Sequence, residues 1–301
     1  MKILITGAAG FIGGHLYLKL AQLGHEVTGI DNFFHPSDNP VAKRILRRDI
    51  RDSLDDLIKW ADLVYHLAAQ IHVDYSISHP RETFQVNVEG TLNILESCRE
   101  YGKKLAFASS SEIYGSSQAD FMDENHPTNP QSPYAATKLT GDKICQVYRD
   151  VYGMQINVIR NFNTFGEYQN DTSYGGVIAI FTRNALAGRP LEIFGDGGQQ
   201  RDYMHIDDAL QGYLMALEKD LPEPVNFGTG RTVSINQLAE KIIRITGSKS
   251  PVVHVQPRPH EVQRLCADVR LARRYGFNPI TDFDRDLKKY IDWYRTRRPI
   301  K

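Results

Sequence analysis

The chain contains few cysteines, and they are not arranged to bind a metal. Cys98, Cys145 and Cys266 are an odd number, lie far apart and lack C-x-x-C spacing. Neither a disulfide framework nor a zinc site is therefore expected, and we predict no metal cofactor. Cysteines without a disulfide pattern are typical of a reducing compartment, so we expect the protein to be cytoplasmic.

An excess of charge and long apolar runs are also lacking. Lysine plus arginine equals aspartate plus glutamate, 36 against 36, so no global field favours nucleic acid or a membrane surface. No apolar run approaches the roughly 20 residues of a membrane span, and the opening MKILITG reads as a strand and turn rather than a signal peptide. We predict neither nucleic acid nor membrane as a partner, and any anion site must be local.

Short β-branched runs alternate with amphipathic segments through the first half of the chain. This alternation is typical of a parallel sheet covered by helices, so we predict an α/β fold with a Rossmann-type doubly wound sheet. The expected strands are residues 2–6, 26–31, one ending at 49–50, 62–69, 104–110 and 156–162, and the expected helices are residues 11–23, 54–60, 88–101 and 134–152.

The pattern changes after Gly166, where a polar loop precedes an expected helix at residues 177–187. Ser234 with Gln237 forms a capping-box pattern that opens another helix. We therefore predict a smaller C-terminal α/β domain that holds the substrate and is partly interleaved with the first. The expected division is residues 1–165 for the cofactor domain and residues 166–301 for the substrate domain.

A glycine-rich turn indicates a dinucleotide site. Gly7, Gly10 and Gly13 stand between the first strand and the first helix, where glycine lets the backbone approach a pyrophosphate at the positive end of a helix. Asp31 ends the second strand, where its carboxylate can accept from both ribose hydroxyls of NAD and repel the extra phosphate of NADP. We predict NAD, although Asp31 can also be a simple turn cap.

Further residues are expected around the same cofactor. Asp49 and Ile50 are placed to flank the adenine, and for Asp49 the capping of the next turn is an equal alternative. The remaining predicted NAD contacts are Phe11, Ile12, Asn32, Leu67, Ala68, Ala69, Gln70, Tyr134 and Lys138.

Tyr134 and Lys138 lie four residues apart, one helical turn from each other on the same face. A neighbouring ammonium and a nicotinamide cation should favour the phenolate, so we expect Tyr134 to act as a base on a substrate hydroxyl while hydride leaves the same carbon. A surface tyrosine and a solvated lysine are the alternative, which the glycine turn makes the weaker one.

Six motifs, taken together, resemble those of the extended short-chain dehydrogenase/reductases that act on nucleotide-diphosphate sugars. They follow in order over nearly the whole chain: TGAAGFIG, HLAAQ, SSSEIYG, SPYAATK, RNFNTFG and QRDYMHIDD. The resemblance implies a Rossmann domain with NAD, a smaller domain with the nucleotide sugar, and a homodimer formed through the helices at about 88–101 and 134–152.

The resemblance also implies roles for individual residues. Ser110 matches the hydroxyl that bonds the reacting sugar oxygen, and Asn163 matches an asparagine that holds the substrate near its phosphates. Arg201 matches an arginine that pairs with the pyrophosphate, with a domain-closing salt bridge as the alternative. Arg258 and Glu261 resemble residues that hold phosphate and ribose, and for Arg258 a solvated basic loop is the alternative.

Glu112 and Ser111 bear on the reaction. Epimerases of this kind usually have a small or neutral residue in place of Glu112, whereas 4,6-dehydratases and decarboxylases have glutamate there. One dehydratase group has aspartate at Ser111 and another has serine. We order the reactions as 4,6-dehydratase, with Glu112 as the base at C5, then decarboxylase, then 4-epimerase. Glu112 in a structural salt bridge and a non-catalytic NAD-binding sensor or scaffold remain alternatives.

Overall fold

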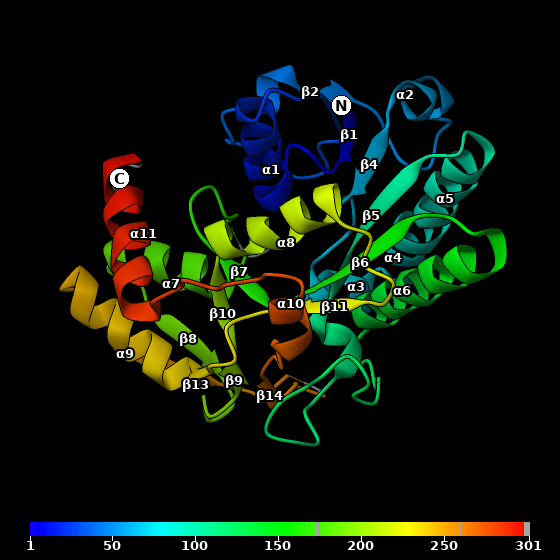
Figure 1. Ribbon diagram of the computed structural model, residues 1–301. Helices are drawn as coiled ribbons and strands as arrows, with labels where there is room; N and C mark the ends of the chain where they lie inside the picture. The colour runs from blue at the N-terminus through cyan, green and yellow to red at the C-terminus, as the bar shows by residue number, and fades with distance from the viewer. Residues whose placement is uncertain (173–174, 259, 298–301) are drawn as a thin grey trace.

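The computed structural model describes residues 1–172, 175–258 and 260–297. Ser173 and Tyr174 of the expected polar loop, and Pro259 between Arg258 and Glu261, lie outside the described residues. A seven-stranded sheet forms the centre, in the order β11-β6-β5-β4-β1-β2-β3 (Figure 1). Its strands are β1 (Lys2–Thr6), β2 (Glu26–Asp31), β3 (Leu46–Arg47), β4 (Leu63–His66), β5 (Lys104–Ser110), β6 (Ile156–Asn161) and β11 (Val225–Phe227).

Every pairing in this sheet is parallel. The strands leave β1 in both directions, which confirms the predicted Rossmann-type doubly wound sheet and places a crevice at the carboxyl ends of β1 and β4. The helices beside it are α1 (Phe11–Gln22), α2 (Asp55–Trp60), α3 (Val73–Ser78), α4 (Pro80–Phe84), the π-helical turn η2 (Gln85–Glu89), α5 (Gly90–Glu100), α6 (Pro133–Tyr152) and α8 (Ile206–Glu218).

Both faces of the sheet are buried, which explains the continuous apolar character of its strands. On β1, Ile3 and Ile5 belong to the core under α1 and α8, whereas Leu4 belongs to the core under α5 and α6. Figure 1 shows α8 crossing one face and α5 and α6 covering the other. The alternation of side chains along a strand therefore divides one buried strand between two cores.

The second part of the chain has its own core. The helices α7 (Val177–Leu186), α9 (Ile235–Thr246) and α11 (Phe283–Arg297) surround it, and the predicted capping box of Ser234 with Gln237 is confirmed at the start of α9. Its remaining elements are β7 (Asn163–Phe165), β8 (Leu191–Phe194), β9 (Gln200–Arg201), β10 (Tyr203–His205), β12 (Val233–Ser234), β13 (Val252–Val255), β14 (Arg264–Leu265) and α10 (Arg270–Arg274).

One predicted boundary is wrong. Asp49 and Ile50 do not end the third strand, because β3 stops at Arg47 and the Asp49 carboxylate accepts from the backbone N–H of Arg51 in a local turn. The helix expected around residues 88–101 is present, since η2, which contains Val88, runs without a break into α5. Two short elements, η1 (Ala42–Arg44) and η3 (Ser111–Tyr114), complete the fold.

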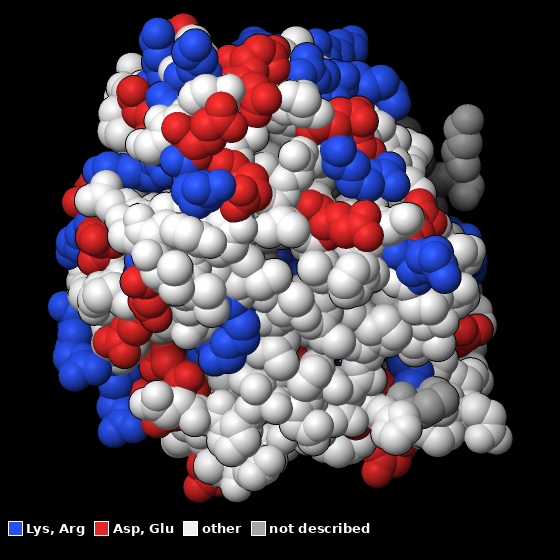
Figure 2. Space-filling view, turned by 90° about the vertical axis from the view of Figure 1, so that its right-hand side faces the viewer, with Lys and Arg blue, Asp and Glu red and all other residues white. Residues whose placement is uncertain are grey.

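None of the helices in the described part of the chain is long and apolar enough to cross a bilayer. Charged side chains of both signs are intermixed on the face shown in Figure 2, as the balanced composition predicts.

Candidate functional site

The glycine turn is packed so closely that only glycine fits. Gly7 has a φ of +72°, and a Cβ there would lie 2.7 Å from the backbone nitrogen of Ala68. At Gly13 a Cβ would lie 2.2 Å from the carbonyl oxygen of Gly7. In the part of the chain that the structure describes, no side chain caps the N-terminus of α1 at Gly10. Its backbone N–H groups are therefore available to an anion.

Asp31 combines the two roles that the sequence left open. Its Oδ2 accepts from the N–H of Ala9 in the glycine turn at 3.2 Å, and its Oδ1 accepts from the N–H of Phe33 at 2.7 Å. Burial is the main cause that raises the pKa of this carboxyl group, against the two backbone hydrogen bonds. Asp31 thus caps its own turn while it stands beside the predicted phosphate site.

Asp49 and Ile50, the residues predicted to flank adenine, have different surroundings. Asn32 donates from Nδ2 to Asp49 at 3.1 Å, and hydrogen bonds from Arg51 hold the pKa of Asp49 well below its usual range. Ile50 is buried in the core, where a Cβ on Gly90 would lie 2.6 Å from its Cδ1. The side chain of Ile50 therefore packs against α5.

A buried chain of hydrogen bonds fixes the turn after β4. Thr6 Oγ1 accepts from the N–H of Ala68 and contacts His66 Nδ1 at 2.8 Å, and His66 Nε2 lies 2.9 Å from Thr91 Oγ1. Burial lowers the pKa of His66 to about 3, so the imidazole is neutral. Leu67 and Ala69 lie in the same turn, which faces the carboxyl end of β1.

Gln70 ends this turn with an unsatisfied donor. Its backbone N–H donates to Asn87 Oδ1 at 2.7 Å and its Oε1 accepts from the N–H of His72. Its Nε2 is buried and has no partner among the described residues. A buried amide donor without a partner is costly unless a ligand accepts from it, so this atom and the glycine cradle fit a bound dinucleotide.

Ser110 and Tyr134 meet at the carboxyl end of β5. Ser132 caps α6 and Pro133 occupies its first turn, and the phenol of Tyr134 hydrogen-bonds Ser110. Lys138 lies one turn later on the same helix and is buried over the ring of Phe107, at 4.5 Å from its centroid. The structure therefore brings Ser110 and Tyr134 into contact and places Lys138 one helical turn from Tyr134.

Burial dominates the electrostatics of Tyr134 and Lys138. Burial raises the pKa of Tyr134 to about 12, the bond from Ser110 lowers it, and the charge of Glu112 raises it. Burial also lowers the pKa of Lys138 to about 8. The stabilisation of the phenolate by Lys138 together with a nicotinamide cation stays a prediction.

Glu112 lies in η3, directly after Ser110. Its backbone N–H donates to Ser110 Oγ at 3.2 Å, and no described side chain hydrogen-bonds or pairs with its carboxylate. Burial is the main cause that raises the pKa of Glu112, while Arg201 and Arg258 lower it. Ser111 is only 3% exposed.

Three predicted substrate residues act on the charge of Glu112, namely Arg201, Arg258 and Glu261. Arg201 NH2 pairs with Glu261 Oε1 at 3.1 Å, within the second part of the chain. Arg258 instead makes an ion pair between the two parts, because its NH2 lies 2.9 Å from Asp74 Oδ2 of α3. The domain-closing ion pair considered for Arg201 is therefore formed by Arg258.

The sequence did not predict two side chains of this region, Asp74 and Phe194. Asp74 carries no sequence signal beyond its place in the first turn of α3, and Phe194 lies under the Arg258 guanidinium at 4.0 Å from the ring centroid. The Oδ1 of Asn163 is buried without a partner in the described part of the chain, which suits a residue that awaits a ligand donor.

Residues 3–228 match the family model described as the NAD dependent epimerase/dehydratase family. The chain belongs to this family. Its cofactor is NAD, as the glycine cradle and the Gln70 donor suggest. Members modify nucleotide sugars, so the chain is an NAD-dependent nucleotide-sugar-modifying enzyme, which confirms the family resemblance drawn from the six motifs.

Three members of the family show the range of its reactions. The UDP-N-acetyl-alpha-D-glucosaminuronate decarboxylase of Bacillus cytotoxicus is 33% identical over 314 residues, which cover 98% of both chains. UDP-glucose 4-epimerase from Thermotoga maritima, solved with UDP-glucose, matches with a TM-score of 0.93 and 32% identity over 98% of this chain and 99% of that chain. The dTDP-glucose 4,6-dehydratase from Streptomyces venezuelae, solved with NAD, matches with a TM-score of 0.91 and 30% identity over 100% of both chains.

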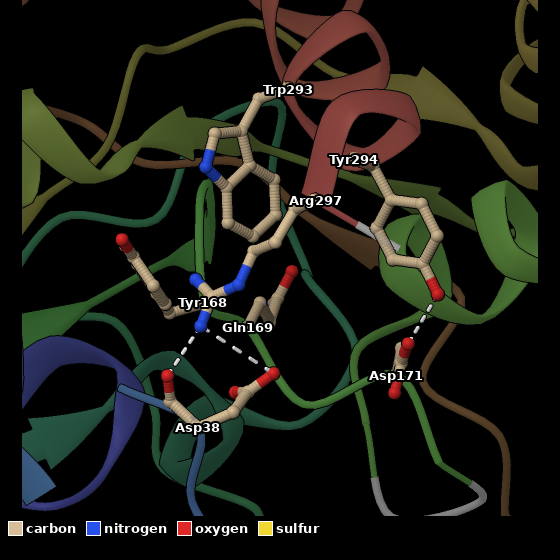
Figure 3. Close-up of a pocket in the computed structure, with 7 residues that line it drawn as sticks. All are labelled: Asp38, Tyr168, Gln169, Asp171, Trp293, Tyr294 and Arg297. Carbon is tan, nitrogen blue, oxygen red and sulfur yellow. Dashed lines mark hydrogen bonds and ion pairs between the residues drawn. The ribbon is translucent and has the colours of Figure 1, made fainter. Parts of the chain in front are cut away.

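A second cluster joins the first and last parts of the chain (Figure 3). The guanidinium of Arg297 lies 3.8 Å from the ring centroid of Tyr168, hydrogen-bonds the carbonyl oxygen of Asp38, and approaches the Asp38 carboxylate at 3.7 Å. Ser37 donates to the carbonyl of Ala9 at 2.5 Å. The end of α11 is thereby tied to the loop that supports the glycine turn.

Proposed function

We propose that the chain is an NAD-dependent nucleotide-sugar 4,6-dehydratase. The observation that carries this proposal is the Glu112 carboxylate, which lies beside the Ser110 and Tyr134 pair and has no partner among the described residues. A 4-epimerase needs no second base, whereas a dehydratase must remove the proton from C5.

In this proposal each side chain has one task. Ser110 hydrogen-bonds the 4-hydroxyl, Tyr134 takes its proton, and Lys138 stabilises the phenolate. NAD supplies, when bound, the hydride acceptor for C4 and the hydride donor for C6. Glu112 removes the proton from C5, which the 4-ketone acidifies, and the C5 proton and the C6 hydroxyl leave together as water. C6 then gains the hydride and C5 gains a proton from solvent, which completes the 4-keto-6-deoxy sugar.

The substrate would be held by residues of the second part. Arg201 and Arg258 are placed to bind the diphosphate, Glu261 the ribose and Asn163 the region near the phosphates. Asn163 Oδ1, which lacks a partner within the described residues, supports its assignment. The ion pairs that Arg201 and Arg258 now make would be exchanged for the diphosphate.

Two other reactions of the family are supported by particular relatives. The Thermotoga maritima epimerase has a TM-score of 0.93 to this chain, and a 4-epimerase would use Tyr134 without a role for Glu112. The Bacillus cytotoxicus decarboxylase is 33% identical, and loss of carbon dioxide from a 4-keto uronic acid needs no base at C5.

The mass of the product separates these reactions. We would incubate the enzyme with UDP-, dTDP- and GDP-linked hexoses and uronic acids and weigh the products. Loss of water supports the dehydratase. Loss of carbon dioxide or an unchanged mass with inverted C4 would replace it with the decarboxylase or the epimerase, and failure to reduce bound NAD with every sugar would favour an NAD-binding sensor.

We also propose a cytoplasmic homodimer that associates through α5 and α6. The face in Figure 2 carries a broad area without charged side chains, and exposed apolar residues on or beside these helices include Phe84, Leu92, Val147 and Val151. Exposed apolar patches of this kind favour association. Sedimentation equilibrium should give twice the mass of 34.2 kDa, and a Val147→Asp variant should sediment as a monomer.

A further inference from the structure

A buried carboxylate lies one helical turn beyond Lys138. Tyr134, Lys138 and Asp142 follow at intervals of four on α6, so their side chains lie along one face of the helix. Asp142 is 0% exposed and Lys138 is 5% exposed. A lysine and an aspartate at this spacing normally attract each other, and that attraction would draw the Lys138 ammonium away from Tyr134.

The carboxylate of Asp142 already has a full set of donors. Arg160 donates from Nε to Oδ2 at 2.9 Å and from NH2 to Oδ1 at 3.0 Å. Ser109 Oγ donates to Oδ2 at 2.6 Å, and Gln146 Nε2 donates to Oδ1 at 2.6 Å. Two parallel bonds from a guanidinium fix both the charge and the orientation of a carboxylate.

Arg160 is itself held in place from the side away from α6. It is 2% exposed, and its NH1 donates to the hydroxyl of Tyr114 at 2.8 Å and to the carbonyl of Glu124 at 3.0 Å. Tyr114 in turn donates to Asn226 Oδ1 at 2.7 Å. The guanidinium therefore cannot move toward Lys138 without breaking these bonds.

The same network sets the position of α6 on β5. Ser109, which binds Asp142, is the neighbour of Ser110 on the strand. A Cβ on Gly141 would lie 2.7 Å from Phe107 Cζ, and the ammonium of Lys138 lies 4.5 Å from the centroid of the same ring. The helix is therefore in close contact with the strand where both contribute to the site.

We infer that Asp142 and Arg160 are positioning residues, a buried pair in which Arg160 holds the Asp142 carboxylate and weakens its pull on the Lys138 ammonium, so that the ammonium can act on Tyr134. This inference rests on the roles given above to Tyr134 and Lys138, and it holds for each of the three candidate reactions, because all begin with oxidation at C4.

The other groups that face Lys138 do not replace this pair. On β4, His66 is neutral, and the thiol of Cys145 is buried with its pKa raised well above the usual value by burial. The titratable and charged groups around the lysine and the pair are Tyr134, Asp142, Cys145, Arg149, His66, Cys98, Arg160, Tyr114 and Glu124. Burial lowers the pKa of Lys138, whereas Cys145 and Asp142 raise it to a smaller extent, so Asp142 is the carboxylate whose pull on the ammonium Arg160 must offset.

Three variants of NAD-loaded enzyme test the inference by the pH dependence of the first oxidation, followed as NAD reduction in a single turnover. In Arg160→Gln the unpaired carboxylate should draw the Lys138 ammonium toward residue 142. The rising limb of the plot of oxidation rate against pH should then move to higher pH by at least one unit, and the rate near neutral pH should fall at least tenfold. In Asp142→Asn the unpaired guanidinium should move the limb to lower pH. The double variant should return the limb to the wild-type position.

Opposite shifts that cancel in the double variant are not expected from a merely structural pair. The inference would be overturned if both single variants lost rate without a shift, or if the double variant stayed as displaced as the singles. Should Arg160→Gln fail to fold, Arg160→Lys keeps the charge but loses the paired hydrogen bonds. Its limb should then stay within a few tenths of a unit of wild type, and a shift as large as that expected for the glutamine variant would overturn the inference.

A second readout separates this inference from the proposed function. Ultraviolet titration of each variant, with its Tyr134→Phe counterpart subtracted, reports the ionisation of Tyr134 without turnover. Absence of turnover of every nucleotide sugar would contradict the proposed function alone. An unshifted Tyr134 titration in both single variants would contradict the positioning role alone.

Discussion

Replacing Glu112 with glutamine should separate the two halves of the reaction. The carboxylate accepts no hydrogen bond and forms no ion pair within the described residues, so the substitution breaks no such contact there. Oxidation at C4 should continue, because Ser110, Tyr134 and Lys138 are untouched. Elimination should fall by about 10²- to 10⁴-fold, the usual contribution of a general base.

The stability of this variant has a predicted sign as well. Burial raises the pKa of Glu112, which means that the charged form is penalised in the folded state and that the folded protein gives up stability as pH rises through that raised pKa. Glutamine removes the penalty, so the melting temperature at neutral pH should stay the same or rise. A carboxylate needed for structure would instead lower it.

The assay combines NAD reduction in a single turnover with product analysis by mass. Glu112→Asp is the matched control, because it keeps the charge but withdraws it by one methylene, and it should lose elimination less than the glutamine variant. Equal loss of oxidation and elimination in Glu112→Gln, together with a lower melting temperature, would refute the assignment of Glu112 as the C5 base.

Three further predictions follow from packing and charge. Gly13→Ala should weaken NAD binding in a titration at least tenfold and cost about 1–3 kcal/mol of stability, because its Cβ would lie 2.2 Å from the Gly7 carbonyl; unchanged binding would contradict the tight turn. Asp74→Asn should change the unfolding free energy by no more than about 1 kcal/mol, since the side chains of Arg258 and Asp74 are 38% and 45% exposed. It should also lower the KM for the nucleotide sugar, because Arg258 no longer has to leave Asp74 to bind the diphosphate. A higher KM would contradict this exchange of Asp74 for the diphosphate. Burial lowers the pKa of Lys138 to about 8, so the unfolded chain binds a proton that the folded protein has lost between about pH 8 and 10.4. The unfolding free energy should therefore rise over this range by up to roughly 3 kcal/mol. Lys138→Met should remove that rise, and equal plots of unfolding free energy against pH for the two proteins would contradict the prediction.

The parts of the fold that depend on local pattern could be predicted from the sequence. The strands at residues 2–6, 26–31 and 104–110 have the predicted bounds, because β-branched residues and turn signals define them locally. The glycine turn was predictable for the same reason. The π-helical turn η2 was not predicted; within it, Asn87 donates to Gln70 and Thr137 from distant parts of the chain, contacts that no local pattern indicates.

The candidate site shows the same division. The spacing of Tyr134 and Lys138 predicted their shared helix face, but their pKa values depend on burial that the sequence does not show. The pair of Arg258 with Asp74 joins residues 184 positions apart. No periodicity or motif indicates such a contact, which arises only when the two parts of the chain meet.

Isotope tracing with two labels decides whether the reaction is a 4,6-dehydration. With a nucleotide sugar deuterated at C4, we expect the deuterium to move to C6 of the product. With the unlabelled sugar in heavy water, we expect deuterium from solvent at C5, because Glu112 removes the original proton. Deuterium that remains at C4 in the first reaction, with none entering C5 in the second, would contradict 4,6-dehydration and would indicate epimerisation.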